Sequence, residues 1–365
     1  MAQTVVPWGH PSAKKIWSAQ LLKETLAKQY WQRFIGTSDA DVIQQKNDLE
    51  SDTGDRVSFD LSVLLRGEAT VGDDRVEGKE ESLRFYSDEV IVDQVRKGVS
   101  AGGKMTRKRI VHNLRRVARN RLSDYFRAWV DNLIFMYLSG ARGINADFDG
   151  FPLAYTGHAG NAFRAPDTDH LKYGGSATAK NNVTSGDVMT RGLVERLSTY
   201  AQMLRALNPE AANLLPTTAA GGEHYVLLMS PLQKNTLRSD ATTGGWLDIQ
   251  KAAAAAEGNS SLIFKGGLGM IDDVILHEHK SVIRFSDYGV GVNLPAARAL
   301  FMGRQAGIIA YGTPNGARFD WVEETKDAGN EAVVYAGNII GMQKARFNNR
   351  DFGVIAVDTY ADPAI

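Results

Sequence analysis

The sequence predicts an α+β fold, and three features of its 365 residues support that prediction. Residues 104–139 carry apolar side chains at helical spacing without an internal proline or glycine, a pattern that predicts one long helix. From residue 262 onward, short apolar runs separated by glycine and polar residues predict a succession of strands. The helices and strands do not alternate, so a parallel sheet of repeated β-α-β units is not expected.

The composition narrows the classes of function. The chain carries 42 basic and 42 acidic residues, so it has no overall positive charge that would indicate nucleic-acid binding. It has no cysteine, which excludes disulfides, thiolate catalysis and cysteine metal sites. We find no export signal and no apolar run of about eighteen residues, so neither export nor a membrane span is expected.

Residues 1–51 are expected to form an N-terminal arm that contains a helix. Ser12 is a suitable N-cap, and Gly36 follows a predicted helix that ends at Phe34. The apolar residues of this helix would pack either on the chain's own core or on a neighbouring subunit, and the sequence favours neither.

Residues 52–98 are predicted to form an extended β-hairpin. Val57, Phe59 and Leu61 alternate with polar residues in its first strand, and a second strand follows near Val90. Residues 67–87 between the strands are polar, and a structureless loop of that length is unusual inside a compact domain. We therefore expect an arm that reaches away from its own domain. Its acidic residues are Glu68, Asp73, Asp74, Glu77, Glu80 and Glu81.

The long helix predicted over residues 104–139 has two different halves. At 1.5 Å per residue it would be roughly 54 Å long. Residues 104–127 contain nine basic residues against one acidic residue, Asp124, and Arg109, Arg116 and Arg127 lie opposite the apolar stripe. The second half is apolar on nearly all sides. We expect a basic exposed face on the first half and burial of the second.

The acidic arm and the basic helix have two interpretations. In the first, the arm and the helix face are both simply exposed to solvent. In the second, the acidic arm of one copy binds the basic helix of another copy through opposite charges.

After the helix, the sequence predicts a surface insertion over residues 143–186, followed by mixed helices and strands. Glycine, alanine, asparagine and threonine dominate the insertion. A helix is predicted over residues 186–206, and Ser230 with Pro231 begins another. Pro295 and Gly303 bound a predicted short helix over residues 295–302. Strands are predicted at 225–229, 262–264, 274–277, 282–285, 308–311, 333–335 and 354–357.

One glycine-rich segment matches most of a phosphate-binding loop. Gly98 and Gly103 have the required spacing and lie between a predicted strand and a predicted helix. However, Met105 occupies the position that needs a serine or threonine hydroxyl for Mg²⁺, and Thr106 lies one residue too late. We therefore prefer a flexible glycine hinge between the arm and the helix.

Two further motifs give no convincing catalytic or metal site. His277 and His279 would face one side of a strand, but no third metal ligand is evident, so two exposed histidines on a surface strand are expected. The triplet of residues 351–353 resembles a kinase metal-binding motif without its partner motifs. We therefore expect no enzyme activity, no cofactor and no metal.

Several short motifs occur in a fixed order along residues 10–357. They are Gly72-Asp73-Asp74-Arg75-Val76-Glu77-Gly78-Lys79-Glu80-Glu81, Tyr86-Ser87-Asp88, Ile91-Val92-Asp93-Gln94, Ile263-Phe264-Lys265-Gly266, Leu268-Gly269, Val274-Ile275-Leu276-His277-Glu278-His279, Trp321-Val322-Glu323-Glu324, Gly329-Asn330 and Phe347-Asn348-Asn349-Arg350-Asp351-Phe352-Gly353-Val354-Ile355. With the order of the parts, they resemble the major capsid proteins of tailed bacteriophages with the Hong Kong 97-type fold, and in particular the coliphage N-four major capsid protein family.

This resemblance implies a structural protein that self-assembles into the hexamers and pentamers of an icosahedral head around double-stranded DNA. The DNA would be held without sequence specificity, and scaffolding, portal and decoration proteins are the other implied partners. The protein would reside in the virion capsid after assembly in the bacterial host cytoplasm, with no membrane contact. The implied parts are an N-terminal arm (1–51), an extended loop (52–98), a hinge and spine helix of the peripheral domain (99–142), the insertion (143–186), an axial domain (187–320) and C-terminal strands that return to the peripheral domain (321–365).

The resemblance also implies which residues make the contact between the acidic arm and the basic helix. The expected contacts between copies join Glu77, Glu80 and Glu81 of one chain to Arg115, Arg116 and Arg119 of another.

Two other classes of function remain open. A nucleic-acid-binding protein that uses the basic face of the helix would lose affinity steeply as salt rises. An enzyme with a site assembled from distant residues would copurify with a ligand or a metal.

Overall fold

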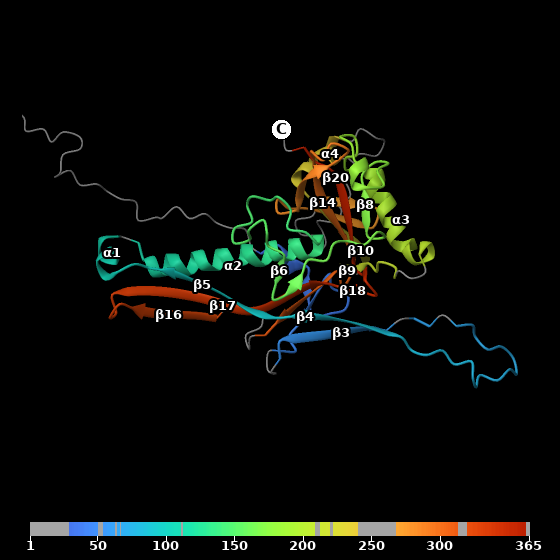
Figure 1. Cartoon of the computed structure of the whole chain (residues 1–365), viewed down its shortest axis with the longest axis horizontal. Helices are drawn as coiled ribbons and strands as arrows, with labels where there is room; N and C mark the ends of the chain where they lie inside the picture. Colours follow the sequence, from blue (N-terminus) through green and yellow to red (C-terminus); the bar gives the residue numbers. More distant parts are fainter. Residues whose placement is uncertain are drawn as a thin grey trace, which may run out of the picture. The chain divides into compact units, whose positions relative to one another are not determined.

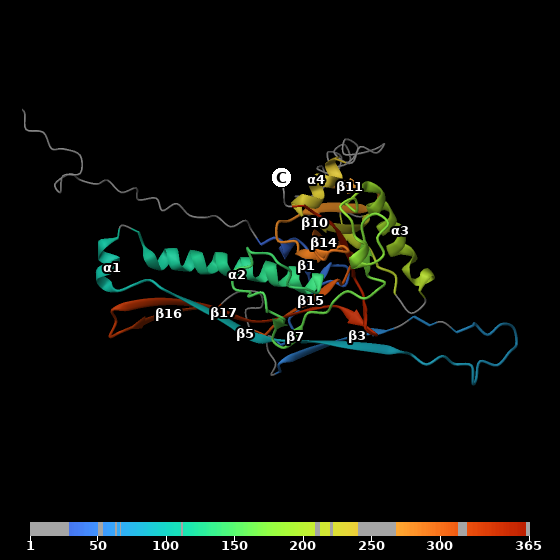
Figure 2. The same cartoon turned by 45° about the horizontal axis from the view of Figure 1, so that its top comes forward.

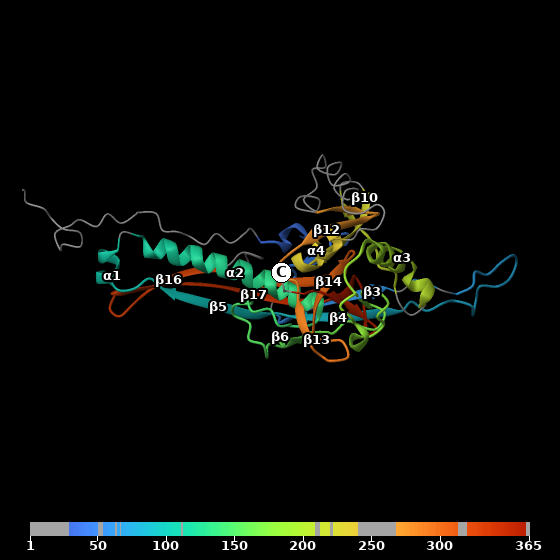
Figure 3. The ribbon, with the colours of Figure 1, turned by 90° about the horizontal axis from the view of Figure 1, so that it is seen from above.

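A computed structural model describes residues 29–49, 54–62, 64–65, 67–110, 112–208, 212–219, 222–239, 268–312 and 320–362. Figures 1, 2 and 3 show the chain from three directions. The described residues form two compact units. The small unit contains Lys97–Phe126 and Trp321–Ala336, and the large unit contains Gln29–Arg96, Arg127–Asp320 and the residues from Gly337 onward.

The core of the large unit is a mixed sheet of eight described strands. Strands β10 (Gly222–Met229) and β12 (Val274–Glu278) are parallel, and β14 (Leu294–Met302) is antiparallel to both β10 and β20 (Val354–Tyr360). The predicted strands at 225–229, 274–277 and 354–357 are therefore confirmed. The strands lie in the order β11 (Gly269–Ile271), β12 (Val274–Glu278), β10 (Gly222–Met229), β14 (Leu294–Met302), β20 (Val354–Tyr360) and β8 (Leu171–Tyr173), with β13 (Arg284–Tyr288) beside β14 and β9 (Thr217–Ala219) beside β10.

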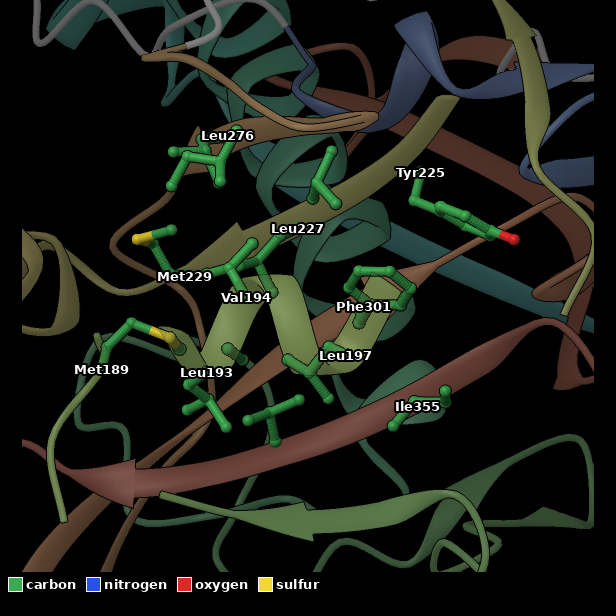
Figure 4. Close-up of a cluster of buried hydrophobic side chains, with 14 of the residues drawn as sticks. Met189, Leu193, Val194, Leu197, Tyr225, Leu227, Met229, Leu276, Phe301 and Ile355 are labelled. Atoms are coloured by element: carbon green, nitrogen blue, oxygen red, sulfur yellow. The ribbon is translucent and has the colours of Figure 1, made fainter. Parts of the chain in front are cut away.

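Helix α3 (Arg191–Leu207) packs against this sheet and confirms the helix predicted over 186–206. Thr190 is its N-cap, because the Thr190 hydroxyl accepts a hydrogen bond from the Leu193 N–H at 3.3 Å. Figure 4 shows the side chains that α3 and the strands contribute to one buried cluster. The cluster includes Met189, Leu193, Val194, Leu197, Leu227, Met229, Leu276, Phe301 and Ile355.

Helix α4 (Pro231–Ser239) begins at the predicted proline. The Gln233 N–H donates to Ser230 Oγ at 3.2 Å, and the Ser230 N–H donates to Gln233 Oε1 at 2.9 Å, so the two residues form a capping box. The same glutamine donates through Nε2 to the Ala297 carbonyl at 3.0 Å, which ties α4 to β14.

A second sheet has the order β1-β2-β15-β17-β16, with β5 beside β17. It contains the predicted strand at 308–311, and the strand predicted at 333–335 is part of a much longer one. The bounds are β1 (Ile35–Gly36), β2 (Ile43–Lys46), β5 (Asp93–Ser100), β15 (Gly307–Tyr311), β16 (Asp320–Lys326) and β17 (Glu331–Lys344). Short hairpins are formed by β6 (Gly157–His158) with β7 (Asn161–Ala162) and by β18 (Arg346–Phe347) with β19 (Arg350–Asp351), and the 3₁₀ turns are η1 (Trp31–Arg33) and η2 (Lys180–Asn182).

The prediction of one uninterrupted helix over 104–139 is wrong at one point. Helix α1 (Lys104–Arg109) ends at Ile110, which is extended, and α2 (Leu114–Ser139) begins afterwards. Asn113 explains the new start, because its Oδ1 accepts the Arg116 N–H at 3.1 Å. The β-branched residues just before it have low helix propensity. The expected contrast between the halves holds, since residues 129–139 are all buried.

The helix predicted over 295–302 is a strand, β14. Its last seven residues are buried, because β14 lies between β10 and β20. A strand covered on both faces loses the alternation of polar and apolar residues that marks a half-exposed strand, so it resembles a helix in sequence.

Three other expectations have mixed outcomes. Most of the helix predicted over 12–34 and the strand at 262–264 lie outside the described residues, and residues 31–33 form only the turn η1. The strand predicted at 282–285 is displaced to Arg284–Tyr288. No helix that the structure describes is long and apolar enough to cross a membrane.

The N-cap at Asn113 is testable. Asn113→Ala removes the acceptor for the Arg116 N–H and should destabilise the start of α2 by about 1 kcal/mol. Hydrogen–deuterium exchange should become faster at residues 114–117. Asn120→Ala, at an exposed position inside the same helix, is the matched control, and equal exchange in the two variants would contradict the assignment.

Candidate assembly surfaces

The arm between β3 (Arg56–Ser62) and β4 (Phe85–Ile91) is the first candidate surface. The two strands are antiparallel, with Arg56 opposite Ile91 and Ser62 opposite Phe85, so the predicted pair of strands is confirmed. Beyond them, the described residues between 64 and 84 form no strand and project away from the hairpin (Figure 1). Val71 and Val76 near the tip are exposed. These exposed apolar side chains make the arm a candidate contact surface.

The acidic residues of the arm differ in availability. Glu81 accepts a hydrogen bond from the Gly67 N–H at 2.6 Å, so it joins the two sides of the arm. Glu80 accepts the Gly78 N–H at 2.7 Å within a local turn and remains exposed. Glu77 is also exposed. Of the three predicted contact residues, Glu77 and Glu80 are therefore placed best to meet another molecule.

The base of the arm is held by the segment that the sequence predicted to be a surface insertion. Asn161 of β7 is buried, and its amide donates to the Ile91 carbonyl at 2.7 Å and accepts the Ile91 N–H at 3.1 Å. This side chain thus replaces a neighbouring strand at the end of β4. Tyr137 of α2 donates to the Asn161 carbonyl at 2.7 Å, which connects the helix to the arm.

Charged side chains reinforce this anchor. Both Asp88 carboxylate oxygens of β4 accept hydrogen bonds from the Arg164 guanidinium, one of them at 2.8 Å. The Arg346 N–H donates to the same carboxylate at 3.3 Å. Arg164 belongs to the insertion and Arg346 to the C-terminal hairpin, so Asp88 joins three segments that are far apart in sequence.

A buried ion pair lies next to the anchor. Lys344 Nζ is 2.5 Å from Asp351 Oδ2, and these side chains are only 0% and 1% exposed. Arg346 Nε donates to the other Asp351 oxygen at 2.9 Å. Burial lowers the pKa of Lys344 to about 8, although the Asp351 charge opposes that shift. The residue that resembled a kinase aspartate is therefore part of a structural ion pair.

The ion pair continues into the insertion through Asp167. The Asp351 N–H donates to Asp167 Oδ2 at 2.6 Å, and His170 Nδ1 lies 3.0 Å from the same carboxylate. Burial works to raise the pKa of Asp167, but the hydrogen bonds and the charge of His170 hold it well below its usual range. Arg350 pairs with Asp169 beside it. We call Asp88, Asn161, Arg164, Asp167, Lys344, Arg346 and Asp351 the arm anchor.

The two histidines are not exposed on a surface strand, so that prediction is wrong. His277 is buried, with its ring 5.2 Å from the ring of Phe34. His279 stacks on Phe135 with the ring centres 4.9 Å apart, and burial, together with Lys280, lowers its pKa to about 4. Both rings serve an aromatic core. Among the residues that the structure describes, no three metal-ligating side chains form a metal site.

The glycine-rich segment is neither a phosphate loop nor the flexible hinge that was expected. Strand β5 continues through Ser100, and a Cβ atom on Gly98 would lie 2.6 Å from the Tyr335 ring. The Lys104 N–H donates to Asn330 Oδ1 at 3.0 Å, and the Gly102 N–H donates to Ser100 Oγ at 3.1 Å. These backbone donors are used inside the protein rather than directed at a ligand.

The basic face in the small unit is the second candidate surface. Arg116 and Arg119 of α2 are exposed, as predicted. Arg115 already pairs with Glu323 of its own chain, with Nε and Oε1 3.0 Å apart. Its predicted contact with another copy therefore competes with an internal partner. Arg116 and Arg119 carry the hypothesis better.

The buried ion pair gives one prediction. Asp351→Ala leaves the Lys344 charge buried beside Arg346 and should lower the free energy of unfolding by about 3–5 kcal/mol. The double variant Lys344→Met with Asp351→Leu removes both charges and should recover most of that loss. Urea unfolding of the unassembled chain measures both values.

The pH dependence provides a check on the same pair. With the Lys344 pKa lowered, the unfolded chain binds more protons than the folded protein between pH 8 and about 10.4. The contribution of this group to stability therefore rises with pH across that window. The assignment would be contradicted if the double variant were as unstable as Asp351→Ala at pH 7. It would also be contradicted if the free energy of unfolding of the double variant kept the pH dependence of the wild type.

The Asn161 contact gives another prediction. Asn161→Ala leaves the N–H and the carbonyl of Ile91 without this partner. The free energy of unfolding should therefore fall by about 1–3 kcal/mol. Amide exchange should become faster at the end of β4, measured by hydrogen–deuterium exchange on the unassembled chain. Asn181→Ala, at an exposed site in the same insertion, should change neither value.

The chain is similar to phage capsid proteins over nearly its whole length. A family model described as phage capsid protein matches residues 5–363. The solved capsid of Ralstonia phage GP4 is 57% identical, with a TM-score of 0.92 and complete coverage of both chains. The capsid asymmetric unit of cyanophage Pam1 has the same fold at 22% identity, with a TM-score of 0.76 and complete coverage of both chains. The major capsid protein of Pseudomonas phage KPP25 is 27% identical over 94% of each chain.

Proposed function

The chain belongs to the phage capsid protein family and is a major capsid protein, and from this premise we propose how one copy holds its neighbours in the shell. The observation that supports this function most directly is the agreement with a solved capsid over the whole of both chains. The role is structural rather than catalytic. Copies join as hexamers and pentamers of a Hong Kong 97-type shell, which assembles in the host cytoplasm.

The parts of the chain take roles in that arrangement. The N-terminal arm (1–51) and the extended loop (52–98) reach other copies. The spine helix (99–142) and the C-terminal strands (321–365) form the peripheral domain, and residues 187–320 form the axial domain. The insertion (143–186) holds the base of the extended loop, a role supported by the hydrogen bonds of Asn161 and Arg164.

The tip of the extended loop binds the basic face of a neighbouring copy. Glu77 and Glu80 are exposed on the loop, and Arg116 and Arg119 are exposed on α2. Glu81 and Arg115 have partners inside their own chain, so they contribute less. One exposed pair is worth about 1 kcal/mol at most. Repetition over all copies of a shell makes the sum large enough to set the geometry and the rate of assembly.

The shell encloses double-stranded DNA without reading its sequence. The equal numbers of acidic and basic residues avoid tight nonspecific binding to DNA. The exposed basic residues Lys104, Lys108 and Arg109 of α1 favour a weak additional contact with phosphates. Scaffolding, portal and decoration proteins complete the set of partners.

Purified protein tests the function directly. It should form closed particles of uniform size, seen by negative-stain electron microscopy and by light scattering. DNA affinity that is high at low salt, in material that forms no particles under any condition, would support the nucleic-acid-binding alternative instead.

Charge reversal tests the contact between copies. Glu77→Lys with Glu80→Lys places like charges against Arg116 and Arg119, and should slow assembly and make particles dissociate at lower salt. Adding Arg116→Glu and Arg119→Glu restores opposite charges and should recover assembly. Light scattering against time measures the rate.

A matched control changes the net charge by the same amount but places the two lysines at other residues. Asp60→Lys with Glu68→Lys reverses two exposed charges elsewhere on the hairpin and arm and should have a smaller effect. Unchanged assembly and salt resistance in the Glu77 and Glu80 variant would sink the hypothesis.

A further inference from the structure

The base of the arm borders an apolar cavity in the large unit. Its volume is about 410 Å³. Leu61, Leu65 and Tyr86 line it from the arm, and Phe347 and Phe352 line it from the C-terminal hairpin. Such a volume is in the range of sites that enclose a ligand or a few side chains.

The mouth of this cavity exposes further apolar surface. Leu64 and Leu65, both in the lining, are 69% and 61% exposed, and Leu215 on the opposite side is 44% exposed. The arm anchor holds the base of β4 beside it, so the cavity is part of an ordered surface. Contiguous exposed apolar residues around a preformed cavity indicate a partner that covers them.

The charges around the cavity favour an acidic partner. Three arginines, Arg84, Arg205 and Arg350, line it against two acidic residues, and one of these, Glu81, already accepts the Gly67 N–H. The Asp351 carboxylate, also in the lining, is already paired with Lys344 and Arg346. Arg350 has a partner in Asp169, whereas Arg84 is exposed on the arm. A partner that fits this surface therefore combines large apolar side chains with adjacent carboxylates.

One segment of the chain has that combination. Strand β16 lies at the end of its sheet, and all seven of its residues are exposed. Trp321 is 39% and Val322 58% exposed, and Glu323 and Glu324 follow directly. A strand at the edge of a sheet also has backbone groups available for contact with another chain.

We propose that the cavity at the base of the arm binds the start of β16 from a neighbouring copy. Val322 covers the apolar lining, and Glu324, on the same face of the strand, lies toward Arg84 and Arg205. This inference rests on the proposed self-assembly of the chain. It assigns a second contact between copies, separate from the one at the arm tip.

Other apolar segments fit the cavity less well. The turn with Val290 and Val292 is exposed, but its nearest acidic residue, Asp287, pairs with Lys180. Val71 and Val76 lie at the far end of the arm.

In the small unit, Arg115 and Glu323 are in contact, so the α2 basic face and β16 are close together. The tip and the base of one arm, separated by about a dozen residues, therefore contact two different neighbours.

The contact joins two different surfaces, so it is heterologous. Repetition of a heterologous contact closes a ring when the rotation between copies permits it. The contact thus suits the ring-shaped capsomers of the proposed shell.

The lack of cysteine makes disulfide trapping a direct test. Chains with Leu65→Cys are assembled together with chains that carry Val322→Cys, and the particles are verified by electron microscopy and oxidised. Covalent dimers should form in the mixture and be absent from particles of either variant alone. Leu64→Cys with Val322→Cys provides a second pair. Mixtures of Leu65→Cys with Val290→Cys or Val71→Cys test the other occupants.

The outcomes separate this inference from the proposed function. If the wild type forms particles but mixed particles show neither β16 cross-link, or show a cross-link only to Val290→Cys or Val71→Cys, the β16 contact is overturned and the capsid role is left intact. Failure of the wild type to form particles would count against the capsid role itself. Hydrogen exchange of wild-type protein needs no variant: residues 61–65 and 321–324 should both become protected on assembly, and protection at neither overturns the contact.

Discussion

The buried charge of Lys344 constrains the structure around the arm. A lysine that is wholly shielded from water requires a carboxylate, and Asp351 supplies it at 2.5 Å. Asp351 also accepts a hydrogen bond from the Arg346 side chain, and the backbone N–H of Arg346 donates to Asp88 of β4. The position of the arm base is therefore fixed by a network of charged side chains, in which each charge is neutralised by another member of the network. Such a network fixes one geometry, because any displacement leaves a charge unpaired in a medium of low dielectric constant.

A second buried charge supports the helix that passes through the same unit. The last turn of α2 leaves carbonyl groups without helical partners, and Arg298 donates to the Ser139 carbonyl at 2.9 Å. Asp358 holds that arginine through two hydrogen bonds of 2.7 Å. The strand β20 thus stabilises the end of the helix. Tyr137, two residues earlier, connects the helix to the insertion and so to the arm.

Features that depend on local sequence could be predicted, whereas features that depend on distant residues could not. Alternation of apolar residues located the strands around the arm, and the Ser230-Pro231 pair located α4. The break before α2 was also local, and Asn113 as an N-cap was the signal for it. Asn161 was not predictable, because nothing in a loop rich in polar residues distinguishes the one that reaches Ile91. The same reason applies to Lys344, whose partner is defined only by the fold of the hairpin.

The chemistry of the arm changes along its length, and this change matters for assembly. Its base is fixed by buried ion pairs and hydrogen bonds, which break slowly because each break leaves a polar group unsatisfied. Its tip carries exposed charges such as Glu77, and contacts between exposed charges are weak and screened by salt. A fixed base preserves the direction in which each copy reaches. The proposed contacts at the tip are weak enough for a wrongly placed copy to leave before the shell closes around it. Strong contacts at the tip would trap such errors, so a rigid base combined with weak proposed contacts at the tip favours regular closed particles.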